Sequence, residues 1–355
     1  MKRTISILVT IFVLSAVFTG CTKTGKNAKG LTNFHLGVMP GTSHLFAFVG
    51  AEEGFFQEEG LNVTISQFAS SGEMVAGLES GKLDAALIGS VPSITQQAAG
   101  HDITIFGGAM TNGHGLIIKS KFIPTDFKEG DIAFLKGHNI ASVINSIQDY
   151  ELQYVLRKNN IEIGEGPNKV NVFYFGSQKD AYAALAGEQI DGSVINTPFA
   201  SRAKNDGHTV VYHCYHISDF ENQPCCRQVT LTKSLADKPD IYLAFERAVI
   251  RAYKFSQENH AKTVEDVAKY IDLDKKDIEY EIYNGHAFSV PDPDKKATTK
   301  LKTDIVAFGY SNGVDYNIDE KYNLDIYKKA LTQIIAENPN DSIYKSLEEH
   351  FNSAN

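Results

Sequence analysis

Residues 70–89, SSGEMVAGLESGKLDAALIG, have a counterpart 107 positions later in residues 177–196, SQKDAYAALAGEQIDGSVIN. The correspondence continues without a gap, so that residues 70–105 align with residues 177–212. Seven positions are identical in the two copies: Ser70/Ser177, Ala76/Ala183, Leu78/Leu185, Asp84/Asp191, Ile88/Ile195, Gly100/Gly207 and His101/His208. This internal repeat decides the fold class.

Each copy has the pattern of one β-α-β unit. A Ser/Gly-rich turn opens a helix, at 72–80 in the first copy and 179–187 in the second, and an Asp then precedes a short apolar strand, at 85–89 or 192–196. A second helix near a proline and a further strand follow. This alternation predicts a mainly parallel sheet with helices on both faces. Two such units predict two similar lobes. The alternative is a coincidence, because βα units in general share this pattern.

Apolar and alternating runs predict the remaining elements. Further strands are expected at 34–39, 61–68, 103–106, 115–119, 138–143, 170–175, 209–212 and 227–232. Further helices are expected from the turn at 40–43 to residue 56, and at 145–156, 241–257, 263–270, 298–310 and 324–337. We expect an α/β protein with one lobe at 33–114 plus 232–355 and the other at 115–231. The two crossing segments would form a hinge.

The first twenty residues are typical of a signal peptide. Lys2 and Arg3 precede an apolar run at 5–18 that is too short for a comfortable membrane span. The run ends in Phe18-Thr19-Gly20-Cys21, similar to a bacterial lipobox, which predicts cleavage after residue 20 and acylation of Cys21. The alternative is ordinary cleavage beside an incidental cysteine. Residues 21–32 are then a polar tether to the membrane.

The charge of the mature chain argues against a nucleic-acid role. Cleavage removes two of the 34 basic residues and no acidic one, which leaves 32 against 43 and a formal net charge of −11. Nucleic-acid binding requires a basic face instead. No later stretch approaches eighteen consecutive apolar residues, so we expect an anchored, extracytoplasmic monomer that does not span the membrane.

An ordered set of short motifs carries a family resemblance: His44-Leu45 with Phe48-Val49, Gly54-Phe55-Phe56, Glu59-Gly60-Leu61, Ser80-Gly81-Lys82-Leu83-Asp84 and Pro291-Asp292-Pro293. The set resembles the substrate-binding proteins of the nitrate/sulfonate/taurine and thiamine-precursor importers. The resemblance implies a two-lobed periplasmic-binding-protein fold, type II-like, that holds a ligand between two mixed sheets. It also implies a permease and a separate ATPase as partners. The chain itself has no P-loop pattern.

The ligand site is expected beyond the carboxyl ends of the strands, as in open α/β sheets generally. Nearly every predicted strand is followed there by Ser, Thr, Asn or Gly, and helix N-termini at such positions favour an anion. The candidate ligand-binding residues in the first lobe are Thr42, Ser43, His44, Ser70, Ser71, Gly72, Gly89 and Ser90. In the second lobe they are Ser142, Asn145, Ser146, Ser177, Asn196 and Thr197.

Arg227, at the return crossing near the floor of the cleft, is a further candidate, since a guanidinium can bind a sulfonate or carboxylate through two hydrogen bonds. Each candidate also has a purely structural alternative. Ser and Asn at helix starts are common N-caps, and Arg227 could be an exposed hinge cation. Asp84 and Asp191 precede their strands, at the end far from the cleft, so we expect structural roles for both.

The three later cysteines allow a disulfide. Cys214 could pair with Cys225 or Cys226 and close a loop of about a dozen residues, worth up to about 3 kcal/mol in the chain-entropy model. A soft metal ion held by these thiols with His213 and His216 is the alternative. The spacing matches no familiar metal motif, so we predict neither a metal nor a cofactor.

The favoured function is capture of a small polar ligand for an importer, with a sulfonate-like anion first and a pyrimidine thiamine precursor second. An enzyme on the same scaffold, of the lyase type, is the rival. General acid–base catalysis would require a titratable group in the cleft. The predicted strand ends offer neutral hydroxyls and amides, with His44 the exception, so we do not expect an enzyme. A role in presenting ligand to a membrane sensor is a third possibility.

Overall fold

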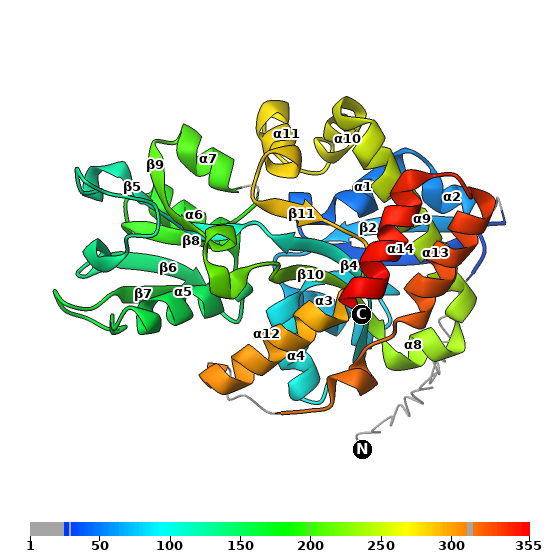
Figure 1. The fold of residues 1–355 in the computed structure, drawn as a ribbon, viewed down its shortest axis with the longest axis horizontal. Coiled ribbons are helices and arrows are strands. Elements are labelled where there is room, and N and C mark those ends of the chain that lie inside the picture. The colour runs from blue at the N-terminus through cyan, green and yellow to red at the C-terminus, as the bar shows by residue number, and fades with distance from the viewer. Residues whose placement is uncertain (1–24, 28–29, 198, 311–314) are drawn as a thin grey trace, which may run out of the picture.

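The computed structural model describes residues 25–27, 30–197, 199–310 and 315–355. Two lobes lie side by side along the long axis, each built around one sheet with helices packed on it (Figure 1). The predicted signal peptide, the predicted acylation site Cys21 and half of the predicted tether (21–24, 28 and 29) lie outside the described residues. In the described part, no helix is both long and apolar enough to span a bilayer.

The first sheet has six strands in the order β11-β4-β10-β3-β1-β2. Strand β1 pairs in parallel with β2 and β3, whereas β10 runs antiparallel between β3 and β4. The bounds are β1 Thr32–Val38, β2 Leu61–Gln67, β3 Ala85–Gly89, β4 Ile103–Asn112, β10 Pro224–Leu231 and β11 Ala287–Ser289. Strand β4 is longer than the expected 103–106, because it continues toward the second lobe.

The second sheet has five strands in the order β7-β6-β8-β5-β9. Strand β6 is parallel to β7 and β8, and β5 is inserted antiparallel between β8 and β9. The bounds are β5 His114–Lys119, β6 Asn139–Val143, β7 Asn171–Phe175, β8 Gly192–Asn196 and β9 His208–His213. Apart from the edge strand β11, the two sheets therefore share one strand order.

The repeat in the sequence is a repeat in the structure. Helix α3 (Ser71–Glu79) corresponds to α6 (Gln178–Ala186), and β3 to β8, each at the offset of 107 residues. The two aspartates repeat in detail. Asp84 Oδ2 accepts a 2.8 Å hydrogen bond from the His35 N–H, and Asp191 Oδ2 accepts a 2.9 Å bond from the Asn139 N–H.

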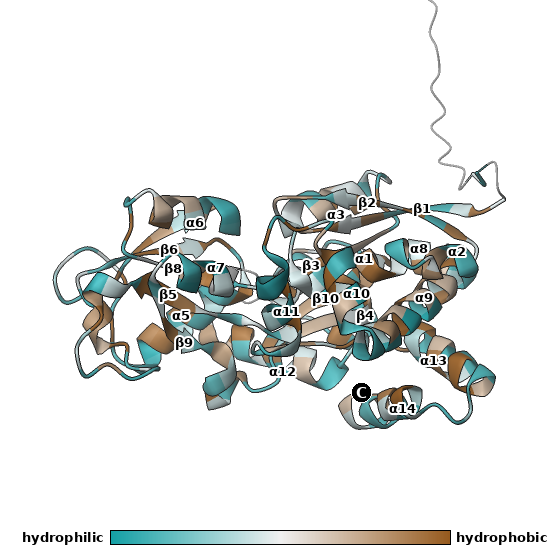
Figure 2. Cartoon of the chain, turned by 90° about the horizontal axis from the view of Figure 1, so that it is seen from above, coloured by the Kyte–Doolittle hydropathy of each residue, from teal (hydrophilic) through white to brown (hydrophobic). Residues whose placement is uncertain are grey.

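Helices cover both faces of each sheet (Figure 2). In addition to α3 and α6, they are α1 Leu45–Glu52, α2 Phe55–Glu58, α4 Ser90–Ala98, α5 Ile147–Lys158, α7 Phe199–Asn205, α8 Thr232–Asp237, α9 Pro239–Glu258, α10 His260–Val267, α11 Lys275–Tyr283, α12 Lys295–Phe308, α13 Asp325–Glu337 and α14 Ser342–Ala354. Helices α8, α11 and α14 and strand β11 were not expected from the sequence.

The core of the first lobe is rich in aromatic rings. Phe245 of α9 stacks on Phe34 of β1 at 4.9 Å and on Phe56 of α2 at 5.4 Å between ring centroids. All three rings are at most 1% exposed, and stacked aromatic pairs add about 0.5–1.5 kcal/mol beyond the area that they bury. The core holds β1, α2 and α9 together, which places the carboxyl end of β1 toward the second lobe.

The boundary between the lobes differs in detail from the expected one. The first crossing, at Asn112–Gly113 between β4 and β5, lies beside the expected boundary at 114/115. The return crossing is earlier than the expected 231/232, since β10 already belongs to the first sheet from Pro224. Helix α12 follows the return crossing and lies against both lobes. Its Thr298 accepts a hydrogen bond from Arg227 of β10, and Leu301 and Ile305 belong to a hydrophobic cluster that combines Val91 and Ile94 of α4 with residues of the second lobe.

The segment at 291–293 contacts β4 closely. Gly108 N–H donates a 2.7 Å hydrogen bond to the Pro291 carbonyl, and a Cβ at Gly108 would lie 1.9 Å from the Asp292 carbonyl oxygen. Glycine is therefore needed at position 108 for the approach.

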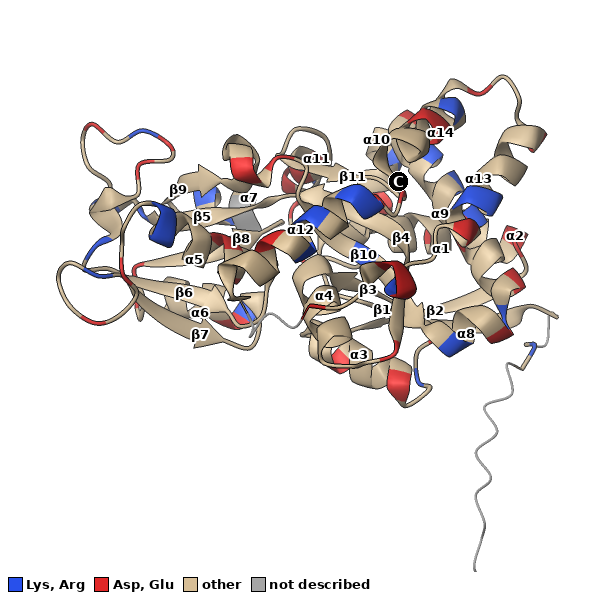
Figure 3. Ribbon diagram, turned by 60° about the horizontal axis from the view of Figure 1, so that its bottom comes forward, with Lys and Arg blue, Asp and Glu red and all other residues tan. Residues whose placement is uncertain are grey.

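Charged side chains of both signs are interspersed over the two lobes (Figure 3), as the mixed composition suggests.

Candidate ligand-binding cleft

A cavity of about 660 Å³ lies between the two sheets. From the first lobe, the segments after β1, β2 and β3 line it, and from the second lobe the segments after β6, β7 and β8 do so. Cys225 and Cys226 of β10 complete the lining. The cavity is thus at the carboxyl ends of the parallel strands, where the sequence predicted the site.

Nine of the fifteen candidate residues line this cavity: Ser43, Ser70, Ser71, Gly72, Gly89, Asn145, Ser146, Ser177 and Asn196. They come from both lobes, so the structure brings residues about 150 positions apart in the sequence to one site. The other six candidates, Thr42, His44, Ser90, Ser142, Thr197 and Arg227, are buried and are not among the lining residues.

The serines at the helix starts act as N-caps. Ser70 Oγ accepts a hydrogen bond from the Glu73 N–H at 3.3 Å, and Ser177 Oγ accepts one from the Asp180 N–H at 3.2 Å. Ser146 caps α5 in the same way. Each cap satisfies one of the four backbone N–H groups that have no intrahelical partner at the start of a helix, and the others remain available to a ligand. Helices α3, α4, α5 and α6 all begin at the cavity, so donors from both lobes converge there.

The six candidates away from the cavity have structural partners or deep burial. Ser142 Oγ donates to Asp149 Oδ1 at 2.8 Å, and His44 Nδ1 accepts from the Met39 N–H at 3.2 Å. Ser90 is fully buried, and its hydroxyl has no hydrogen-bond partner within the part of the chain that the structure describes. Thr42 Oγ1 donates to Thr197 Oγ1 at 2.7 Å, which joins the two lobes.

Arg227 is not at the floor of the cleft, contrary to expectation. Its side chain is 1% exposed and donates to the Cys226 and Met110 carbonyls at 3.0 and 3.3 Å. It also donates to Thr298 Oγ1 at 3.3 Å, and Asp294 lies 3.8 Å from it. These contacts attach α12 to β10, so the guanidinium has a structural role in this arrangement.

The expected disulfide is not formed. Cys214, Cys225 and Cys226 are buried free thiols. Register shifts in the pairing of β10 with β4 around Pro224, Cys226 and Arg227 interrupt the regular alternation of side chains, and the Cys225 and Cys226 sulfurs lie 3.2 Å apart. The hydrogen bond from Cys225 and the neighbouring His44 lower the pKa of Cys226 well below its usual value, although burial opposes this.

The chemistry of the cavity is polar but almost uncharged. Among the described residues that line it, none has a carboxylate, and Lys179 is the one lysine or arginine. Apolar side chains, which include Phe68, Val143 and Ile144, form part of the wall. The arrangement offers many hydrogen-bond donors to one small ligand. It offers no carboxylate or imidazole to act as a general base.

Several lining residues were not predicted from the sequence, most of them amides: Gln67, Phe68, Gln96, Gln148, Gln178 and Lys179. Gln67 and Phe68 could have been found, because they end the second predicted strand, three and two positions before Ser70. Gln178 could not. Its Nε2 donates to the Val194 carbonyl at 2.8 Å, a contact that depends on how α6 packs on β8.

Two sheets of one strand order, with a polar cavity between their carboxyl ends, define a two-lobed protein of the periplasmic-binding-protein class. The profile of the NMT1-like family matches residues 27–272, and the chain belongs to that family.

The chain is similar in sequence to two curated proteins and in fold to a solved structure. The "Putative binding protein YtlA" of Bacillus subtilis is 26% identical over 255 residues, which are 69% of this chain and 73% of that protein. A "Putative aliphatic sulfonates-binding protein" of the same organism is 30% identical over 147 residues, which are 40% of this chain and 42% of that protein. The periplasmic nitrate-binding protein NrtA from Synechocystis PCC 6803 shares the fold, with a TM-score of 0.70, 16% identity, and coverage of 88% of this chain and 91% of that one.

Proposed function

We propose that this protein is the lipid-anchored substrate-binding subunit of an ABC importer, and that its ligand is a small organic anion, sulfonate-like or taurine-like. One observation carries the proposal: four helices from two lobes begin at a cavity whose described lining contains no carboxylate. Helix N-termini bind anions through backbone N–H groups and the positive end of the helix dipole.

The wall of the cavity supports an organic anion over a bare inorganic one. Phe68, Val143 and Ile144 supply apolar surface beside the polar helix starts. Two acceptor oxygens of lining residues, Gln178 Oε1 and Asn196 Oδ1, have no hydrogen-bond partner among the described residues. A ligand with an amino group near its sulfonate, such as taurine, would donate hydrogen bonds to these acceptors.

The relatives named above support a binding function over catalysis, since their names describe binding proteins. Delivery to a membrane permease, with energy from a separate ATPase, follows from the importer assignment. Acylation at Cys21 would hold the protein at the extracytoplasmic side of the membrane, with residues 21–32 as the tether.

Calorimetry of the purified mature chain with taurine, ethanesulfonate, nitrate and a hydroxymethylpyrimidine tests the ligand class. We expect the sulfonates to bind at least about tenfold more tightly than nitrate or the pyrimidine. Asn196→Ala should weaken taurine binding about tenfold, because one hydrogen bond to a charged group is worth about 1.5–3 kcal/mol. Binding of the pyrimidine alone would overturn the sulfonate assignment.

The exposed Lys179 provides a matched pair of variants. Lys179→Met should weaken sulfonate binding roughly two- to fivefold, the usual range for an exposed charge. Lys136→Met removes an exposed lysine outside the cavity and should leave the affinity unchanged. Equal effects of the two variants would mean that the ligand senses only the net charge of the protein and does not bind at α6.

A further inference from the structure

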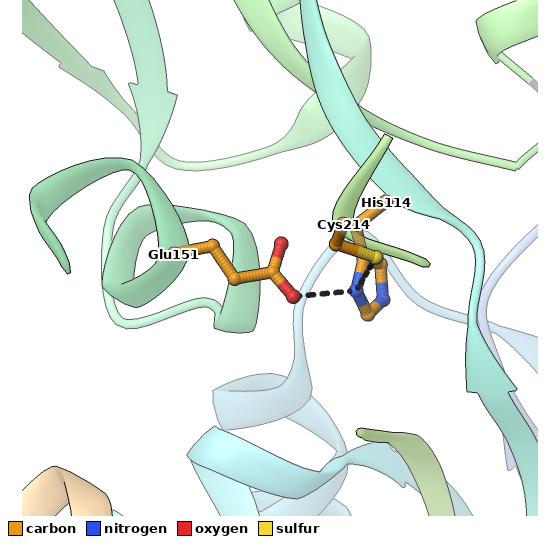
Figure 4. Close-up of side chains that lie close together, drawn as sticks. All are labelled: His114, Glu151 and Cys214. Atoms are coloured by element: carbon orange, nitrogen blue, oxygen red, sulfur yellow. Dashed lines mark hydrogen bonds and ion pairs between the residues drawn. The ribbon is translucent and has the colours of Figure 1, made fainter. Parts of the chain in front are cut away.

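Three side chains with metal-binding atoms meet in the second lobe, outside the cavity. They are His114 at the start of β5, Glu151 on α5, and Cys214 at the start of the short helix η4 (Cys214–His216). Their Nδ1, carboxylate oxygen and Sγ atoms lie within 4.8 Å of one another, and each side chain is at most 1% exposed. Glu151 points from its helix toward the ring of His114, and Cys214 lies against the same ring (Figure 4).

Hydrogen bonds do not account for all of these contacts. His114 Nδ1 lies 3.0 Å from Glu151 Oε1 and 3.8 Å from Cys214 Sγ. A ring nitrogen carries at most one hydrogen, so it cannot donate a full hydrogen bond to both neighbours. The other ring nitrogen, Nε2, is buried and has no partner in the described part of the chain. Three groups that can each offer a lone pair therefore meet at one place, and a single hydrogen on His114 Nδ1 can satisfy only one of its two neighbours.

The energetic cost of this cluster also calls for an explanation. A buried ion pair such as His114–Glu151 is seldom more stable than well-packed apolar residues of the same volume. The surroundings here are apolar and aromatic, and include Ile147, Tyr150 and Tyr212. A buried imidazole, carboxylate and thiol in one place are thus poorly explained by stability alone.

We propose that His114, Glu151 and Cys214 form a binding site for a single zinc-like divalent ion. The donor set indicates the class of ion. Nitrogen and sulfur ligands select Zn²⁺ and related borderline or soft ions, whereas Mg²⁺ and Ca²⁺ prefer oxygen alone.

The geometry agrees with this class. Tetrahedral zinc with ordinary bond lengths places its ligand N and O atoms about 3.3 Å apart and its N and S atoms about 3.6 Å apart. The distances here, 3.0 and 3.8 Å, differ from these by a few tenths of an ångström. The charges also balance, since one carboxylate and one thiolate neutralise a divalent ion. Three protein ligands leave a fourth position for water or another donor.

The site lies where the chain passes between the lobes. His114 directly follows the first crossing, and Cys214 begins the return. A bound ion would tie both segments to α5 and stiffen the region next to the hinge. The site is separate from the cavity, and the inference does not depend on the ligand proposed above.

The test uses the mature chain after metal removal by a chelator, titrated with Zn²⁺ alone and separately with Co²⁺. We expect one ion per chain, a rise in the melting temperature with zinc, and a thiolate-to-cobalt charge-transfer band with Co²⁺. Cys214→Ser should abolish the band and weaken zinc binding at least about tenfold, since even outer-shell partners of a metal are worth that much. Glu151→Gln, close in shape, should weaken zinc binding similarly.

Cys225→Ser is the control, because it removes a neighbouring buried thiol that is not one of the three ligands. It should leave zinc affinity and the cobalt band unchanged, and circular dichroism confirms that each variant is folded. The proposal is overturned if the metal-free chain binds no zinc at micromolar concentration. It is also overturned if Cys225→Ser abolishes the band and Cys214→Ser and Glu151→Gln do not.

Discussion

Thr42 of the first lobe donates a 2.7 Å hydrogen bond to Thr197 of the second, across 155 residues of sequence. Both hydroxyls are buried, and each follows the carboxyl end of a strand, β1 or β8. The bond exists only while the lobes are together. A second contact, from Asn145 Nδ2 to Thr95 Oγ1 at 3.1 Å, joins the segment between β6 and α5 to α4 across the same boundary.

Thr42→Val should shift the equilibrium of the lobes toward an open form. A buried hydrogen bond contributes about 1 kcal/mol net, so the closed population should fall about fivefold relative to the open one. Small-angle scattering should show a larger radius of gyration without ligand, and ligand affinity should fall by a similar factor. Thr332→Val, an exposed threonine on α13, is the control. An unchanged radius would mean that other contacts hold the lobes together.

The two repeated aspartates should affect stability and spare binding. Asp84→Ala and Asp191→Ala each remove the acceptor for a backbone N–H at a strand start, which should cost about 1–2 kcal/mol in the free energy of unfolding. Urea denaturation measures this loss. Asp126→Ala, an exposed residue, should cost almost nothing. Loss of ligand affinity in a folded Asp84 variant would contradict the structural role.

Stability should fall on acidification through the histidines that link the lobes. Burial and the neighbouring His286 lower the pKa of His213 to about 4, although Glu129 opposes this. His213 contacts His286 of the first lobe and His216, with ring centroids 4.4 and 5.8 Å apart. Unfolded histidine has a pKa of about 6.5.

Between pH 6.5 and 4, therefore, the unfolded chain binds a proton that the folded chain does not. The free energy of unfolding should fall by about 1–3 kcal/mol in this range and stay constant with respect to this group above it. Urea midpoints at several pH values measure the effect, and His213→Asn should remove most of it. An identical pH dependence in the variant would assign the loss to other groups.

Arg227→Met distinguishes the expected role of this residue from the observed one. The buried guanidinium donates to two carbonyls and to Thr298, so its loss should cost about 2–4 kcal/mol of stability. Ligand affinity at a temperature where the variant is folded should change little. A large loss of affinity with unchanged stability would support the ligand-binding role that the sequence suggested.

Cys21→Ser tests membrane attachment. The variant should lose labelling by a fatty-acid analogue and move from the membrane to the soluble fraction, because cleavage and acylation both require the cysteine. Fractionation of cells that express the full-length chain measures this. A wild-type protein that is already soluble and unlabelled would contradict lipidation.

Much of the fold could be predicted because the repeated unit occurs twice in the sequence and each copy has its own local capping and strand patterns. The helix starts at Ser70 and Ser177 have the same capping pattern, and the strands at 85–89 and 192–196 were predicted with their observed bounds. The position of the cavity followed from the direction of the parallel strands. Even so, the choice between cap and ligand contact at each serine could not be made from the sequence, since both roles use the same residue types.

The remaining features depend on contacts between distant segments. The orientation of Arg227 follows from a β-bulge that interrupts the alternation of side chains along β10. The cluster of His114, Glu151 and Cys214 combines residues 37 and 100 positions apart, and therefore has no spacing that a motif could match. Strand β11 has only three residues, too few for a pattern.

The insertion of β10 between β3 and β4 sets an order in which the two sheets can be completed as the chain is synthesised. Every strand of the second sheet lies within one continuous segment, His114–His213. The first sheet has a gap between β3 and β4 until Pro224–Leu231 has been synthesised. Gly89, for example, pairs with Cys226, which follows the whole second sheet in the sequence. The second lobe can therefore finish its sheet before the first, even though the first begins earlier in the sequence.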